Sequence, residues 1–165
     1  MARARLAGLL MLGLALTALL ATAAMAANTT TQTVTYEVSA INEISDDGDP
    51  GALTVSTATA GSEPDDATDS STTYAITTNG TTKKLTGKID TAMPANVTLQ
   101  VNLTAPTGGV GAGDVTLTGT DADLVTSIET VAESGKTIAY TLSATVAAGV
   151  VASAQKTVTL TLTDE

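Results

Sequence analysis

The 165-residue sequence contains no cysteine, histidine, tryptophan or phenylalanine, and tyrosine, present three times, is its only aromatic residue. Without cysteine the chain can form no disulfide and no thiolate nucleophile. Without histidine it lacks the side chain that most often acts as an acid or base near neutral pH. Zinc fingers and haem ligation by these residues are excluded too. Any core must therefore be built mainly from Val, Leu, Ile and Ala.

The start of the chain carries a targeting pattern. Arg3 and Arg5 give it a positive charge, and the uncharged apolar run 6–20 follows. Residues 24–26 read Ala-Met-Ala, the small-residue pattern at which signal peptides are cleaved. A retained membrane anchor usually needs about 20 strongly apolar residues, whereas this run passes into small residues. The pattern therefore favours a secretory signal peptide over an anchor.

We accordingly predict a signal peptide at residues 1–26 and a single secreted domain at residues 27–165, a length that suits one domain. The expected location is extracellular or on the cell surface, after transit through the periplasm in a Gram-negative host.

The predicted domain is strongly acidic. Once Arg3 and Arg5 are removed with the signal peptide, five of the seven basic residues remain with all 17 acidic ones, which gives a net charge of −12. Such a chain repels nucleic-acid phosphates and anionic membrane surfaces. We therefore expect no nucleic-acid partner and no membrane insertion after signal cleavage. The charge favours solubility, cation binding or a saline habitat.

Four stretches alternate strictly between apolar and polar residues: Thr33–Ala40, Val97–Leu103, Ile138–Val146 and Val158–Leu162. A period of two indicates strands with one buried and one exposed face. Threonine, which is abundant throughout, also favours strands because it is β-branched. Shorter candidate strands are 52–57, 72–78, 82–89, 114–118 and 123–128.

About nine strands and no convincing helix predict an all-β fold. One-sided strands bury their apolar faces best in two packed antiparallel sheets, so we expect an immunoglobulin-like or jelly-roll β-sandwich. The dipeptide Asn79-Gly80 predicts a type I′ hairpin that places Tyr74 opposite Leu85. The alternation places Tyr36, Tyr74 and Tyr140 on core faces.

Two acidic loops are candidate calcium sites, because Ca²⁺ takes six to eight hard oxygen ligands. Neither has the spacing of an EF-hand loop, and solvated turns have the same composition. The candidate ligands are Asp46, Asp47 and Asp49 in the first loop, and Asp65, Asp66 and Asp69 in the second.

No motif indicates an enzyme. The glycine-rich stretch 107–113 lacks the Lys-Ser/Thr ending of a phosphate-binding loop, and Asp114 follows it. The many carboxylates form accidental pairs and specify no reaction. We expect a non-enzymatic protein that needs no cofactor, calcium aside.

The signal peptide, the first alternating strand, the segment Tyr74–Leu85, the strand Thr137–Val146 and the closing strand resemble small secreted prokaryotic β-sandwich surface proteins of the fimbrial or biofilm-filament subunit type. The resemblance implies assembly by strand complementation, in which a terminal segment of one subunit completes the sheet of another. The donor is then either Asn28–Ala40 or Thr157–Thr163, since both are terminal, alternating and poor in charge.

Two functions follow as expectations. The first is a structural subunit of a surface filament (pilus or fimbria) or of a biofilm matrix, with copies of itself or other cell-surface proteins as partners. The alternative is a monomeric secreted adhesion or binding module, with or without calcium dependence.

Overall fold

The computed structural model describes residues 28–165, so the predicted signal peptide lies outside the described residues. The chain divides into two units, residues 1–37 and residues 38–165. In the described part of the first unit, residues 28–37, every residue is exposed and none belongs to a helix or strand.

The second unit is all-β. One short 3₁₀ turn, η1 (Val146–Ala148), accompanies the strands. In chain order the strands are β1 (Asn42–Asp46), β2 (Ala67–Thr78), β3 (Lys83–Ile89), β4 (Val97–Leu103), β5 (Val110–Gly111), β6 (Val115–Thr116), β7 (Ala122–Ile128), β8 (Val131–Ala144) and β9 (Val158–Asp164).

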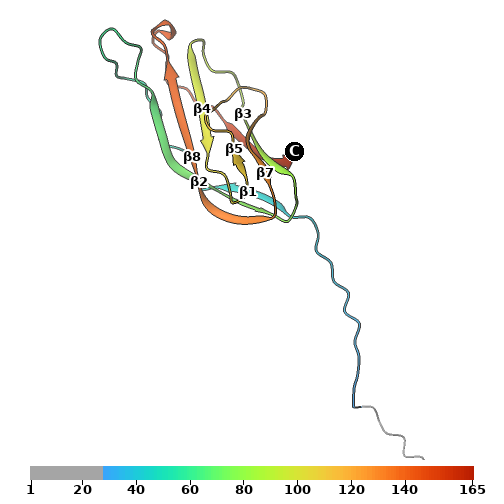
Figure 1. Cartoon of the computed structure of the whole chain (residues 1–165). Helices are drawn as coiled ribbons and strands as arrows, with labels where there is room; N and C mark the ends of the chain where they lie inside the picture. The colour runs from blue at the N-terminus through green and yellow to red at the C-terminus, as the bar shows by residue number, and fades with distance from the viewer. Residues whose placement is uncertain (1–27) are drawn as a thin grey trace, which may run out of the picture. The chain divides into compact units, whose positions relative to one another are not determined.

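These strands form two antiparallel sheets packed as a sandwich (Figure 1). The first sheet has the order β1-β2-β8-β4-β6, and the second has the order β5-β7-β3-β9. Across the two layers β1 contacts β9 and β4 contacts β7. The predicted all-β sandwich is thereby confirmed.

Apolar residues from both sheets meet in one core. The alternation predicted in β4 and β8 places Leu99, Val101, Leu103, Ile138 and Tyr140 inward, as a period of two requires. The most completely buried side chains are Tyr74, Ile76, Leu85, Ile89, Val101, Leu124, Val125 and Ile128. The core is thus aliphatic apart from two tyrosines.

Tyr74 shows how a polar atom is accommodated in this core. Its hydroxyl donates a hydrogen bond to the Thr104 carbonyl at 2.8 Å. Burial, together with the nearby negative charge of Glu133, raises the pKa of Tyr74 to about 12. The phenol is therefore held in its neutral, donating form.

Two predicted strands are absent from the sheets. Residues 33–40 and 52–57 join no ladder of the described chain, and the edge position is taken instead by β1, whose only partly buried residue is Ile44. Tyr36, predicted to face the core, is 88% exposed. Alternation identified an amphipathic segment there, but its apolar side chains stay exposed within residues 28–165.

The predicted hairpin at Asn79-Gly80 is wrong. β2 and β3 lie in different sheets, so Tyr74 pairs with Asp46 and Lys136, and Leu85 pairs with Val125 and Leu162. Neither turn residue has the positive φ that a type I′ turn needs. Residues 79–82 carry the chain from one sheet to the other instead of reversing it within one.

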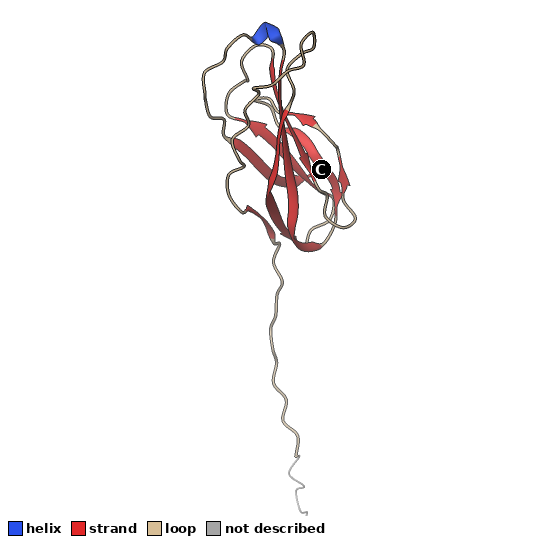
Figure 2. Cartoon of the chain, turned by 90° about the vertical axis from the view of Figure 1, so that its left-hand side faces the viewer, coloured by secondary structure: helices blue, strands red, loops and turns tan. Residues whose placement is uncertain are grey.

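The sandwich has two distinct ends. At the β1 end, β1 begins, β2 finishes and β8 begins, since Thr78 pairs with both Asn42 and Val131. At the η1 end, β2 and β4 begin and β8 finishes, since Leu142 pairs with both Ala67 and Leu99. Figure 2 shows η1 at this second end. The 12 residues of β2 separate the two ends by roughly 35 Å.

Candidate functional site

The most unusual surface feature is the segment 33–41, which we call the N-terminal arm. Its apolar side chains Val34, Tyr36 and Val38 are 76%, 88% and 78% exposed. They recur at every second position, so an extended chain presents them on one side and Thr33 and Thr35 on the other. The first residue of any sheet is Asn42. The arm therefore has the pattern of a half-buried strand while remaining outside both sheets.

The base of the arm is fixed to the β1 end of the sandwich by Asn79. The Asn79 side-chain amide donates to the Ser39 carbonyl at 2.8 Å, and its Oδ1 accepts from the Ile41 N–H at 2.8 Å. The Asn79 backbone N–H also donates to the Ile41 carbonyl at 3.2 Å. These three hydrogen bonds set where the chain leaves the sandwich.

The second predicted donor, Thr157–Thr163, has a different environment. Most of it is β9, which pairs with β3 along all seven of its residues. Its inward residues Val158, Leu160 and Leu162 pack against the core and are half-buried. β9 is thus an integral edge strand of the second sheet: it is hydrogen-bonded to β3 on one side and, within the described chain, to no strand on the other.

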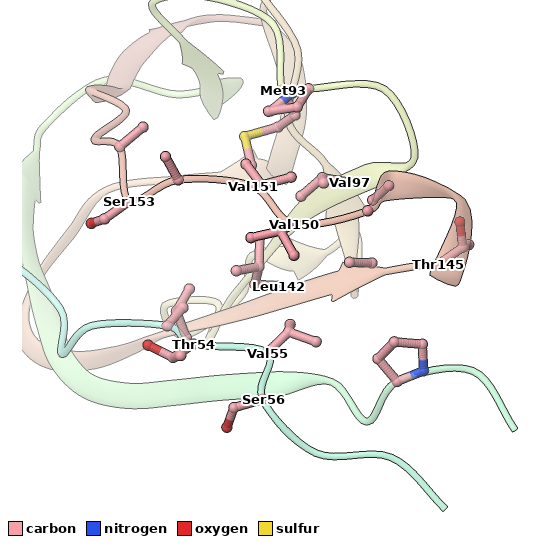
Figure 3. A pocket seen from close by; sticks show the side chains of 18 of the residues that line it. Thr54, Val55, Ser56, Met93, Val97, Leu142, Thr145, Val150, Val151 and Ser153 are labelled. Carbon is pink, nitrogen blue, oxygen red and sulfur yellow. The ribbon is translucent and has the colours of Figure 1, made fainter. Parts of the chain in front are cut away.

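A groove of about 760 Å³ opens at the η1 end. Its floor includes Leu142 and Met93, which pack against the core, and the partly buried Val97. Two irregular segments line it, residues 53–58 after β1 and residues 148–154 between η1 and β9. Figure 3 shows Val150 and Val151 on one side of the groove and Thr54, Val55 and Ser56 on the other.

The groove is predominantly apolar and nearly free of charge. Of the residues that line it, only Lys156 is charged, and its ammonium group donates to the Thr91 hydroxyl at 2.6 Å. Val146, Val150 and Val151 are exposed at its rim, Val150 fully so. A concave, mostly apolar hollow with few polar groups is the usual form of a binding site, so this groove is a candidate binding site.

The six predicted calcium ligands lie along β1, β2 and the chain between them. Asp46 ends β1 and its carboxylate accepts from the Gly48 N–H. Asp47 and Asp49 follow β1, Asp65 and Asp66 precede β2, and Asp69 lies within β2.

Two further carboxylates accept hydrogen bonds that lower their pKa. The Thr73 backbone N–H and hydroxyl donate to Asp47 at 2.7 and 2.8 Å and lower its pKa. The Ser71 hydroxyl and backbone N–H lower the pKa of Asp69 in the same way. Within residues 28–165 no three acidic side chains gather closely enough to hold a metal ion. The calcium site stays a prediction.

Sequence reasoning identified the arm but missed the groove. The groove is assembled from segments that are distant in the sequence, so no local motif marks it. The one available signal was the apolar pair Val150-Val151 in a stretch without alternation, which left both side chains without an assigned core position.

No protein-family model matches this chain, and the comparison with curated proteins found no relative. Within residues 28–165 there is no helix of the length and apolar character needed to cross a membrane. Function is therefore inferred from the chain's own residues and geometry.

Proposed function

We propose that this chain is a non-enzymatic extracellular structural protein, a subunit that assembles by strand complementation into a surface filament of the pilus or fimbria type or into a biofilm matrix. The observation that carries the proposal is the N-terminal arm. It has the alternation of a strand and exposes Val34, Tyr36 and Val38 to solvent, although it belongs to neither sheet of its own sandwich.

Strand addition suits the arm for an energetic reason. Full burial of an aliphatic or aromatic side chain contributes about 1.5–3 kcal/mol, so three of them contribute several kcal/mol in total. Association costs an estimated 4–15 kcal/mol, so apolar burial alone leaves little surplus. Main-chain hydrogen bonds to a free strand edge, combined with pockets for alternate side chains, supply the affinity and specificity of this binding mode.

The arm is a better donor than the strand near the C-terminus. To donate β9 to a neighbour, the subunit has to break seven residues of pairing with β3 and expose half-buried core residues. Donating the arm breaks no ladder within residues 28–165. We therefore favour residues 28–40 over Thr157–Thr163 as the segment that is exchanged.

Secretion and surface location form part of the proposal. They are supported by the predicted signal peptide at residues 1–26 and by the high acidity of the remaining chain, which keeps an exported protein soluble before assembly. The expected partners are further copies of this chain and other cell-surface proteins.

The direct test compares unboiled and boiled samples of residues 27–165 on an SDS gel. We expect a ladder of oligomers that collapses to one band on boiling. Tyr36→Ser, which removes the largest apolar side chain of the arm, should deplete the ladder. Thr35→Ser, one residue away on the opposite face, should leave it intact.

A single band in both lanes, with the wild-type chain monomeric by light scattering, would rule out the filament function. It would favour the alternative, a monomeric adhesion or binding module. In that case a melting temperature raised by millimolar Ca²⁺ would support calcium-dependent binding through the two acidic loops.

A further inference from the structure

We infer that the groove at the η1 end is the acceptor for the N-terminal arm of a second copy of this chain, with Val34, Tyr36 and Val38 of the arm facing the apolar floor around Leu142. This inference rests on the proposed function and specifies which surface of the neighbouring subunit the arm fills.

The distribution of exposed apolar side chains carries the inference. Within residues 28–165, the large hydrophobic residues that remain exposed fall into two groups and one exception. The arm holds Val34, Tyr36, Val38 and Ile41, the groove rim holds Val146, Val150 and Val151, and Val110 stands apart on β5. Bringing the two groups together removes almost all of this exposed apolar surface from water, which is the main favourable term in protein association.

The groove also has the form that a strand requires. On one wall Leu53 and Val55 are partly buried while Ala52, Thr54 and Ser56 are exposed, the alternation of a strand lying over an apolar floor. That wall and the opposite segment 150–156 belong to no ladder of the described chain, so their peptide groups can pair with an added strand. When extended, residues 34–38 of the arm and residues 52–56 of the wall each span about 16 Å, so the two segments are equal in length.

Charge favours this contact over other surfaces of the molecule. Two copies that each carry a net charge of −12 repel one another over most of their surfaces. The groove lining contains no carboxylate, and its one charged residue is Lys156. The arm segment 33–41 contains a single charged residue, Glu37. The one carboxylate of the arm therefore meets a groove whose only charged lining residue is cationic.

The positions of the two surfaces make the contact head-to-tail. The base of the arm is held at Asn79 on the β1 end, whereas the floor of the groove lies at the opposite, η1 end. An interface between two different patches is heterologous, and it produces an open filament when the rotation between subunits does not close a ring. The inferred contact is thus sufficient to build the proposed polymer from one kind of subunit.

Substitutions of exposed residues outside the core test the groove. Val150→Asp places a carboxylate at the rim, where a docked arm would have to desolvate it. We expect the fraction of SDS-resistant oligomer to fall at least about tenfold, which corresponds to about 1.4 kcal/mol. Val110→Asp is the matched control, because Val110 is also an exposed valine but lies outside the groove. It should leave the ladder unchanged.

A cysteine pair locates the contact directly, because the natural chain has no cysteine. The double variant Val34→Cys with Val150→Cys keeps Tyr36 and replaces each valine by a side chain of similar size. Oxidised after assembly, it should give disulfide-linked multimers that survive boiling and disappear on reduction. Val34→Cys with Val110→Cys should give none, since a disulfide needs Cβ atoms about 3.5–4.5 Å apart.

These results separate the two proposals. If the wild-type chain forms oligomers but Val150→Asp leaves them intact and the Val150 pair does not cross-link, the groove is overturned as acceptor and the filament function survives. If the wild-type chain forms no oligomers, both are overturned. Cross-linking through the Val110 pair would place the acceptor at β5 and would also overturn the groove.

Discussion

Asn79 holds the backbone of Ser39 through a hydrogen bond of 2.8 Å from its side-chain Nδ2 to the Ser39 carbonyl. The other atom of the same amide, Oδ1, accepts from the Ile41 N–H at an equal distance. A single side chain thereby presents one donor and one acceptor to the arm, as a peptide group of a neighbouring strand would. The base of the arm is consequently fixed even though the arm lies outside both sheets.

Replacement of Asn79 should loosen this base with little effect on the sandwich. Asn79→Ala removes both side-chain hydrogen bonds, so we expect faster hydrogen exchange at the Ile41 amide and a loss of global stability of no more than about 1.5 kcal/mol. Asn79→Asp keeps the acceptor for the Ile41 N–H but cannot donate to Ser39. It should therefore retain most of the protection at Ile41. Unchanged exchange in the alanine variant would show that the contact does not restrain the arm.

Two buried threonines on β2 should respond in opposite ways to valine, which keeps the β-branched shape. The hydroxyl of Thr72 is buried without a hydrogen-bond partner in the described structure, so Thr72→Val should stabilise the domain by about 1 kcal/mol. The hydroxyl of Thr78 donates to Asn42 Oδ1 at 2.7 Å and accepts from the Gly80 N–H at 3.0 Å. Thr78→Val should therefore cost about 1–3 kcal/mol. Urea unfolding measures both, and the same sign for both would contradict this reasoning.

A second pair of variants tests the packing between the sheets. A Cβ atom added at Gly87 would lie 2.6 Å from the Cδ1 of Leu124 and 3.4 Å from a methyl group of Leu160. Leu124 is itself buried, so Gly87→Ala should cost about 1–3 kcal/mol through overpacking. Gly119 is exposed, and the nearest atom to a Cβ added there would be the Ile89 carbonyl oxygen, at 4.0 Å. Gly119→Ala should be neutral, or stabilising by up to about 1 kcal/mol because the unfolded chain loses freedom.

Acid should destabilise the sandwich in part through Glu133. A side-chain hydrogen bond from Lys136 and further hydrogen bonding from Thr107 lower the pKa of Glu133 to about 2. Because the folded pKa is below the unfolded value, near 4.3, the contribution is fully present above that value. It is lost as the pH falls from about 4.3 towards 2.

The variant Glu133→Gln should flatten the dependence of the unfolding free energy on pH in this window. Lys136→Gln should reduce it as well, since it removes the main cause of the shift. Urea unfolding at a series of pH values measures the slope for each chain. A slope in Glu133→Gln equal to that of the wild type would show that the ion pair does not contribute in solution.

Alternation of apolar and polar residues predicted the sheets well where the apolar face is covered by the same chain. Leu99, Val101 and Leu103 of β4 point inward as expected. The same alternation failed at Val34 and Tyr36, because a period of two shows only that a strand has an apolar face. It does not say which chain covers that face. A segment that completes another subunit, as proposed for the arm, would have the same pattern as a strand of its own core.

The remaining errors have local causes. β1 carries a single apolar residue, Ile44, between polar ones, so its hydrophobic signal was too weak to detect. Asn79-Gly80 has the composition of a hairpin turn. In the folded chain, however, the Asn79 side chain forms hydrogen bonds with Ser39 and Ile41, and the dipeptide adopts a different conformation. Such contacts join residues 38 or more positions apart, and no window of sequence contains them.

The pairing of the strands also dictates when the domain can fold. Among the ladders of the two sheets, only the β1–β2 ladder pairs strands that are consecutive in the chain. β2 and β4 both pair with β8, and β3 pairs with β9. Non-local pairing of this kind makes folding slow, in the range of milliseconds to seconds. β8, the central strand of the first sheet, and β9, an edge strand of the second, are synthesised after the strands with which they pair. The two sheets can therefore be completed only after the last described strands are made, and a chain exported as proposed above would still be extended when it is threaded across the membrane.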